Sequence, residues 1–231
     1  MKSFLAAIAF LTRLPIRAPF TAEDVGRGAI FFPLVGAGIG GLQWALWSGA
    51  VGYLTPLVAA TLVVAFGAWL TRGLHWDGLA DFVDGLGGGW TREDALRIMK
   101  DSRIGAFGGL ALILVVVLKV AAIEALAAPL ALIVAPALAR LTPVILGVAL
   151  PYARGSDAPS AHTGWIALGG STATCVGLAW VLDSLPLLGV AVGVSVLIGV
   201  IARRRLGGVT GDVLGACVEL SETAMLVVAG L

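Results

Sequence analysis

Long apolar runs fill most of the chain, and short segments rich in polar residues, Gly or Pro separate them. A helix needs roughly 20 apolar residues to cross a bilayer. By this criterion the pattern predicts about seven transmembrane helices, or six if the polar-diluted fifth candidate is excluded. The predicted spans are residues 30–50, 54–72, 107–127, 129–151, 164–183, 186–202 and 209–231. The apolar run within residues 1–12 is too short to cross and predicts an interfacial or re-entrant helix.

The basic residues support this arrangement of spans. If the N-terminus lies in the cytoplasm and the spans alternate in direction, every Lys and Arg outside a span falls on one side. Arg72 ends the second predicted span on that same side, and only Lys119 and Arg140 lie in the interior of predicted spans. Cytoplasmic loops of membrane proteins carry such an excess of positive charge. We therefore predict a cytoplasmic N-terminus.

The composition agrees with a membrane protein. Hydrophobic residues make up 59% of the 231 residues, charged residues only 13%, and the mean hydropathy is +1.00; soluble domains carry roughly 25% charged residues. We expect an all-α, polytopic membrane protein in which residues 1–231 form a single integral membrane domain. The net charge of +1 gives no indication of a nucleic-acid partner. Cys175 and Cys217 lie in apolar runs and are expected to be small buried hydrophobes.

The longest polar connection, about residues 73–106, is predicted to be a cytoplasmic loop that contains the active site. It begins with GLHWDGLADFVDGL, in which the spacing puts Asp77, Asp81 and Asp84 on one face of a helix. No Lys or Arg lies between Gly73 and Trp90 to offset their repulsion. A divalent cation would do so, and hard oxygen ligands favour Mg²⁺ or Mn²⁺ over zinc. These aspartates are therefore predicted metal ligands; a solvated helix face is the alternative.

Two further features of this loop suggest phosphate binding. The tract from Gly85 to Gly89 is expected to end the helix, and the backbone N–H groups of Gly87 and Gly88 to form a phosphate-binding nest. A flexible connector is the alternative explanation of these glycines. Thr91 is predicted to begin the next helix as its N-cap.

Cationic side chains follow in the same loop. Arg97, Lys100 and Arg103 are candidates for binding phosphate oxygens. No Gly-Lys-Ser/Thr sequence follows the glycines, so ATP hydrolysis by a P-loop is disfavoured. A magnesium-bound diphosphate substrate is the interpretation that these residues favour.

The last predicted span carries Asp212, Glu219 and Glu222 on one helical face with Gly215. Ionisable groups in a membrane are costly and usually face a bundle interior or a polar cavity. Asp212 lies near the cytoplasmic end and is a candidate substrate-binding residue. Glu219 is expected either to form a structural ion pair with Arg140 or to serve function. A small transporter, with these charges along its path, is one alternative function.

A second alternative comes from a partial motif. Gly73, Asp77 and Asp81 read G-x-x-x-D-x-x-x-D, and Asp81, Asp84 and Gly85 read D-x-x-D-G. These resemble the two halves of the CDP-alcohol phosphotransferase signature. The halves overlap in the wrong order, and the Ala-Arg after the first half is missing. The family is therefore not assigned, although a membrane phosphotransferase using another nucleotide-activated donor stays an alternative.

A fuller resemblance runs from Phe4 to Glu222. In order, the chain contains FLTRLP, FFPLVGAGIG, GLHWDGLADFVDGL, RIMKDSRIGAFG and TGDVLGACVE. This series resembles the adenosylcobinamide-GDP ribazoletransferase (cobalamin synthase) family. The resemblance implies an enzyme of the bacterial cytoplasmic (inner) membrane, embedded in lipid, with its active site facing the cytoplasm. Homo-oligomerisation stays open.

The same resemblance implies a reaction and roles for the candidate residues. The enzyme would join adenosylcobinamide-GDP to α-ribazole or its 5′-phosphate, giving adenosylcobalamin or its 5′-phosphate and GMP, with Mg²⁺ required. The three aspartates of the acidic motif would hold Mg²⁺ on the diphosphate. Arg103 and Lys100 would neutralise charge on phosphate oxygens. Asp84 or Asp101 would be the general base, and His75 either shares that role, binds substrate or is a polar anchor.

Overall fold

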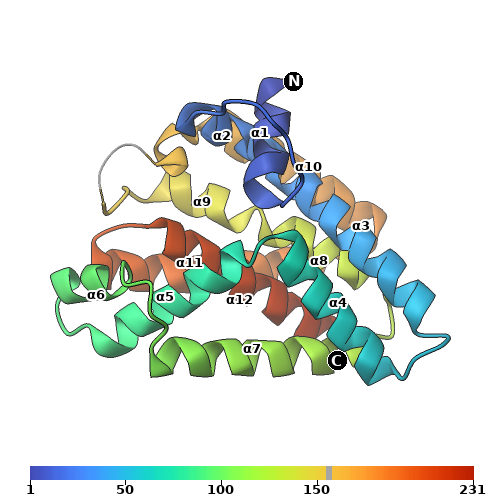
Figure 1. The fold of residues 1–231 in the computed structure, drawn as a ribbon. Helices are drawn as coiled ribbons and strands as arrows, with labels where there is room; N and C mark the ends of the chain where they lie inside the picture. Colours follow the sequence, from blue (N-terminus) through green and yellow to red (C-terminus); the bar gives the residue numbers. More distant parts are fainter. Residues whose placement is uncertain (155–157) are drawn as a thin grey trace.

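The computed structural model describes residues 1–154 and 158–231. Helices form nearly all of the regular structure of these residues, and the one β feature is an isolated bridge between Tyr152 and Val209. The all-α prediction is confirmed. The helices are α1 (Lys2–Leu11), α2 (Ala22–Gly28), η1 (Ala29–Phe31), α3 (Phe32–Ala50), α4 (Pro56–Leu70), α5 (Leu74–Gly88), α6 (Arg92–Ile98), α7 (Ala106–Glu124), α8 (Ala131–Ala139), α9 (Thr142–Ala149), η2 (Pro159–His162), α10 (Trp165–Val181), α11 (Leu185–Leu206) and α12 (Gly211–Ala229) (Figure 1).

Six of the seven predicted spans coincide with one helix each, and the fourth, residues 129–151, coincides with the pair α8 and α9. Fewer segments have the length and composition to cross a membrane. Among the described residues four segments qualify, and α4 and α5 together would make a fifth. The four segments are Ala22–Ala50, Ala106–Glu124, Ala131–Ala149 and Leu185–Leu206. Helix α10 has 17 residues and is too short, and α12 carries three acids. Because α5 lies at 89° to α4, we describe α5 as a separate element beside the spans.

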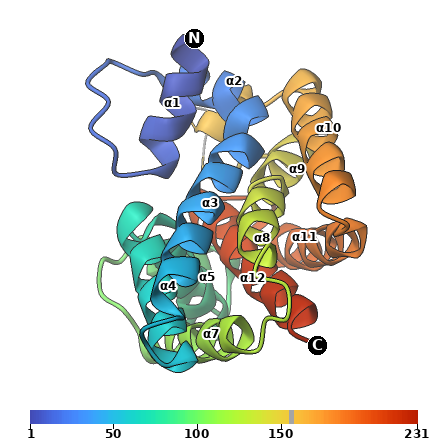
Figure 2. The ribbon, with the colours of Figure 1, turned by 90° about the vertical axis from the view of Figure 1, so that its right-hand side faces the viewer.

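The helices divide into a central and an outer group. Helix α12 is buried along most of its length and contacts α5, α7, α8, α9 and α11 (Figure 2). The outer helices instead expose large apolar side chains, such as Ile113 and Val117 on α7 and Val196 and Leu197 on α11. A soluble monomer rarely exposes apolar patches of this extent. The outer surface is therefore suited to lipid.

The bend between α4 and α5 is formed by two consecutive residues with left-handed backbone, Arg72 (φ 57°) and Gly73 (φ 68°). The N-terminal segment holds this turn. Arg72 donates a hydrogen bond to the Ala9 carbonyl (2.9 Å), and the Arg13 N–H donates to the Leu70 carbonyl (2.8 Å). Helix α1 is thus tied to the start of α5. The bend turns the acidic motif across the bundle.

The prediction that the glycine tract ends the acidic helix is confirmed, since α5 ends at Gly88 with Gly89 as its C-cap, but the helix includes most of the tract. The glycines allow close helix contacts: a Cβ on Gly87 would lie 2.6 Å from the Phe107 ring, and one on Gly89 would lie 2.5 Å from the Ala95 backbone. Tertiary packing therefore outweighs the low helix propensity of glycine. Because Gly87 and Gly88 are helical, the predicted nest does not form.

Several smaller predictions are confirmed. Thr91 caps α6, since its hydroxyl accepts a hydrogen bond from the Asp94 N–H (3.1 Å). Cys175 and Cys217 are free and buried. Helix α1 has only ten residues, which agrees with an element that does not cross the membrane.

Candidate active site

Helices α5 and α12 pack through glycine. A Cβ on Gly78 would lie 3.0 Å from the Asp212 carbonyl oxygen and 3.2 Å from the Gly215 Cα. The absence of side chains at both glycines lets the two backbones meet. This contact joins the acidic motif to the first turn of α12, as Figure 1 shows.

Three carboxylates gather where these helices meet, on Asp77, Asp81 and Asp212; we call them the aspartate cluster. Asp77 is exposed, while Asp81 and Asp212 are half-buried. Burial raises the pKa of Asp81 to about 6, and the charges of Asp77 and Asp212 contribute to the same shift. Arg154 opposes it and lies 2.9 Å from Asp212, between Nη1 and Oδ2. Negative charge therefore exceeds positive charge at the cluster.

Asp84, the third residue of the predicted triad, is bound elsewhere. Its carboxylate accepts hydrogen bonds from the backbone N–H groups of Gly105 (2.7 Å) and Gly108 (2.8 Å). These groups lie at the N-terminus of α7, where N–H groups have no partner within the helix and a negative charge is favoured. Asp84 therefore fastens α5 to α7, and both of its oxygens are engaged.

The described residues contain no group of three or more Asp, Glu, His or Cys side chains that could hold a metal ion. A complete magnesium site is therefore not preformed by the protein alone. Mg²⁺ usually binds one or two carboxylates together with waters and substrate phosphates. The aspartate cluster offers such oxygens without competing soft ligands. The donor set fits Mg²⁺ that is shared with a diphosphate.

The predicted phosphate-binding residues lie on α6 and the loop after it. Arg97 pairs with Asp94 (3.0 Å), and Arg103 donates two side-chain hydrogen bonds to Asp101 (3.0 and 2.7 Å). Lys100 is exposed. Hydrogen bonds from Arg103 lower the pKa of Asp101 to about 2, which makes this carboxylate a weak base. The structure therefore pairs both arginines with acids of their own segment, not with the aspartate cluster.

Arg154 is the cation at the cluster that the sequence analysis did not select. Its position depends on a contact between distant segments: the Ala153 N–H donates to the Val209 carbonyl (2.8 Å), and the Val209 N–H donates to the Pro151 carbonyl (2.9 Å). These bonds hold the segment after α9 against the residues that precede α12. No local sequence pattern signals such a contact.

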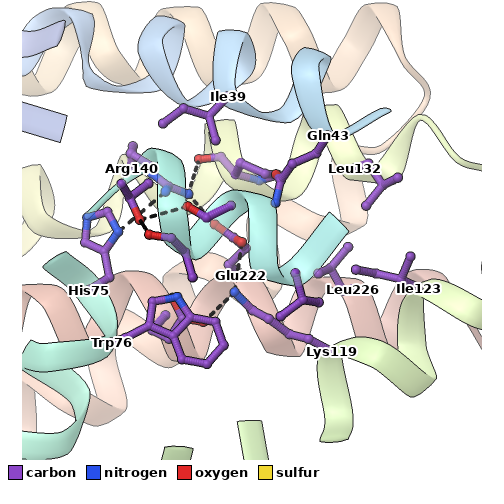
Figure 3. Close-up of a pocket in the computed structure, with 16 residues that line it drawn as sticks. Ile39, Gln43, His75, Trp76, Lys119, Ile123, Leu132, Arg140, Glu222 and Leu226 are labelled. Carbon is purple, nitrogen blue, oxygen red and sulfur yellow. Dashed lines mark hydrogen bonds and ion pairs between the residues drawn. The ribbon is translucent and has the colours of Figure 1, made fainter. Parts of the chain in front are cut away.

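Four charged side chains form a buried ion cluster in the interior, namely Lys119, Arg140, Glu219 and Glu222 (Figure 3). Lys119 pairs with both glutamates, at 2.9 Å from Glu222, and Arg140 pairs with Glu222. The predicted Glu219–Arg140 ion pair is therefore replaced by three others. Because a single buried charge is expensive, mutual pairing makes this set tolerable.

The first turn of α5 packs against the buried ion cluster. His75 is buried, and its Nδ1 lies 3.5 Å from an Arg140 guanidinium nitrogen. Trp76 places its ring 5.3 Å from Lys119 Nζ (Figure 3). About 20 Å³ of space remains among these side chains, which is enough for one water. The two residues immediately before Asp77 are thus anchored in the interior.

A larger cavity of about 280 Å³ lies beside the aspartate cluster. Its walls are mostly apolar and come from α1, α2, η1, α3, α5, α9, η2, α12 and the segment after α9. Asp77 and Asp212 lie on its wall. Asp84, Asp101 and the predicted phosphate-binding residues Arg97, Lys100 and Arg103 do not line it. The cavity and the aspartate cluster together form the candidate active site.

Residues 3–230 match the family model described as cobalamin-5-phosphate synthase. The chain belongs to this family. A relative from Chlorobaculum tepidum named adenosylcobinamide-GDP ribazoletransferase is 42% identical, over 100% of this chain and 96% of the relative. Relatives with the same name from Syntrophobacter fumaroxidans (40% identical, 96% of both chains) and Leptothrix cholodnii (41%, covering 96% and 92%) are also similar. No solved structure matches the chain.

Membership of the cobalamin-5-phosphate synthase family confirms the resemblance drawn from the five sequence motifs. The chain is an enzyme, a transferase of cobalamin nucleotide-loop assembly. Family membership therefore favours the ribazoletransferase interpretation over the two alternatives, a small transporter and a CDP-alcohol-type phosphotransferase. The intramembrane charges that favoured a transporter instead pair with one another.

Proposed function

We propose that this chain joins adenosylcobinamide-GDP to α-ribazole or its 5′-phosphate and releases GMP. The relatives of the chain are named for this transfer. The observation that carries the proposal is the convergence of Asp77, Asp81 and Asp212 beside a cavity, with Arg154 at their edge. A diphosphate donor and a second, smaller substrate need neighbouring sites of this kind.

The reaction is a displacement at phosphorus. A hydroxyl oxygen of the ribazole forms a bond to the phosphorus that carries the corrinoid arm. The bond from this phosphorus to the GMP oxygen breaks, GMP leaves with the electron pair, and the hydroxyl loses its proton. Arg154 is the side chain of this chain best suited to neutralise a diphosphate oxygen, because it already lies beside the cluster.

Mg²⁺ is the proposed cofactor, and the aspartate cluster would hold it. When bound there, the ion would offset negative charge on the diphosphate and on the departing GMP. Asp84 would keep its place at the N-terminus of α7. The excess negative charge of the cluster and its hard oxygen donors support this assignment.

We also propose that the cluster faces the cytoplasm, in the inner membrane of a bacterium. The segments with positive charges contact one another in this structure. Arg154 donates to the Leu96 carbonyl (3.4 Å), Arg205 donates to the Gly89 carbonyl (2.7 Å), and Arg72 contacts the N-terminal helix. Positively charged segments are usually retained in the cytoplasm.

The test uses purified protein in lipid nanodiscs with adenosylcobinamide-GDP, α-ribazole and Mg²⁺. We expect release of GMP together with a corrinoid product, and loss of both when EDTA removes Mg²⁺. D81N should lower kcat by about a hundredfold or more, since metal assistance is worth several kcal/mol. The matched control is D183N at an exposed turn, where Asn also tolerates the positive φ. Normal turnover in D81N would reject the metal-ligand role, and GMP release without a corrinoid product would reject the reaction.

A further inference from the structure

The apolar cavity has the position of an acceptor site. Asp77 and Asp212 lie on its wall, and the rest of the lining includes large apolar side chains such as Phe10, Phe32 and Leu214. A molecule inside therefore has an apolar end to bury and reaches the aspartate cluster at its other end. This arrangement suits a nucleoside whose base is apolar and whose sugar hydroxyl reacts.

The size of the cavity indicates which substrate of the proposed reaction it can hold. At about 280 Å³ it is close to the lower end of small-molecule pockets, roughly 300 Å³. A bicyclic aromatic base has room in it, but a corrin macrocycle does not. Guanine would fit by size, yet its edge carries several donors and acceptors that mostly apolar walls leave unpaired.

One polar group on the wall lacks a partner. Ser160, in η2, is only 9% exposed, and its Oγ has no hydrogen-bond partner in the described part of the chain. Its position is fixed by packing of η2 on α2, because Gly26 leaves room for the Pro159 carbonyl and for His162. A buried hydroxyl without a partner costs free energy. A ligand atom that accepts one hydrogen bond would remove this cost.

We propose that this cavity binds the benzimidazole base of the ribazole acceptor and that the Ser160 hydroxyl donates to its unsubstituted ring nitrogen. The benzimidazole base has one such acceptor and is otherwise apolar, which matches the buried, unpartnered Ser160 hydroxyl in mostly apolar walls. The sugar then points toward Asp77 and Asp212. The inference rests on the proposed function and assigns one of its two substrates to a site.

The experiment measures equilibrium binding of α-ribazole, without donor, to the full chain in nanodiscs. L214W fills the cavity from α12 and should weaken α-ribazole binding at least tenfold while leaving GMP binding unchanged. Unchanged α-ribazole binding in a folded L214W would overturn the proposal. Loss of GMP binding with α-ribazole binding retained would overturn it as well, because the cavity would then belong to the donor.

A second pair of variants tests Ser160 without filling space. An indole analogue of α-ribazole carries C–H in place of the unsubstituted ring nitrogen, and wild type should bind it about fivefold more weakly. S160A should bind both compounds equally. The control is S195A, a buried serine that bonds to the Ala191 carbonyl and should keep the fivefold preference. A preference that persists in S160A would refute the hydrogen bond.

Measurements of turnover distinguish between an error in this site assignment and an error in the proposed function. If wild type forms no corrinoid product with α-ribazole, the proposed function fails. If wild type turns over but L214W and S160A keep the wild-type KM for α-ribazole, only the site assignment fails.

Discussion

Gly78 on α5 faces the backbone of Asp212 on α12 so closely that a methyl group on Gly78 would lie 3.0 Å from the Asp212 carbonyl oxygen. Asp77 and Asp81 are carried by the same helix as Gly78. The distance between the carboxylates of the two helices therefore depends on this glycine.

Substitution of Gly78 should separate the two halves of the aspartate cluster. A Cβ at this distance from backbone forces the helices apart, and overpacking of this kind costs about 1–3 kcal/mol. We expect G78A to lower kcat about tenfold and G78V to lower it further, as measured by GMP release. G109A on α7 is the control, because its Cβ would meet nothing within 4 Å. Equal activity of G78V and G109A would show that the contact does not set the geometry.

Arg154 should contribute more to binding of the donor substrate, adenosylcobinamide-GDP, than Arg103 in the loop after α6. Arg154 is held at Asp212, whereas Arg103 is paired with Asp101 and its side chain is 86% exposed. We expect R154Q to raise the KM for adenosylcobinamide-GDP at least tenfold and R103Q to raise it less than threefold. Steady-state kinetics of the two variants side by side measure this difference. The reverse order would return the phosphate-binding role to Arg103, as the sequence analysis predicted.

The sequence anticipated the parts of the site that local spacing determines. Asp77 and Asp81 share a helical face because their separation is one helical turn, and Asp212 stood out because an acid near a membrane-spanning segment is costly. Asp84 differs because its partners are N–H groups of α7, and helical spacing does not identify a partner on another helix. Arg154 was missed for the same reason.

The remaining differences also have tertiary causes. The tract from Gly85 to Gly89 was predicted to end the acidic helix, and α5 ends there only at Gly88, because contacts with α6 and α7 favour helix through most of the tract. Fewer segments than the seven predicted spans meet the length and composition criterion, because apolar composition does not distinguish a helix facing lipid from one buried inside the protein. Helix α12 shows this, since it is buried by its neighbours and carries three acids.

The buried ion cluster should contribute to stability through mutual compensation of its charges. In E222Q, Arg140 loses its ion-pair partner and Lys119 loses one of two. Leaving a buried charge unpaired costs roughly 3–5 kcal/mol, so we expect a large fall in the thermal unfolding midpoint in detergent. E124Q at the exposed end of α7 is the control and should unfold like wild type. A midpoint in E222Q that equals that of E124Q would mean that Glu222 is not needed to neutralise the two cations.

Asp84 should behave as a structural cap and not as a metal ligand. D84A leaves the N–H groups of Gly105 and Gly108 without their acceptor, and an unsatisfied buried donor costs about 1–3 kcal/mol. We therefore expect D84A to lower the unfolding midpoint, and D84N, which retains one acceptor oxygen, to lower it less. Activity should fall in the same order as stability, and the Mg²⁺ concentration for half-maximal rate should stay unchanged in D84N. If D84N instead unfolds like wild type but needs far more Mg²⁺, Asp84 binds the metal and the predicted acidic triad is restored.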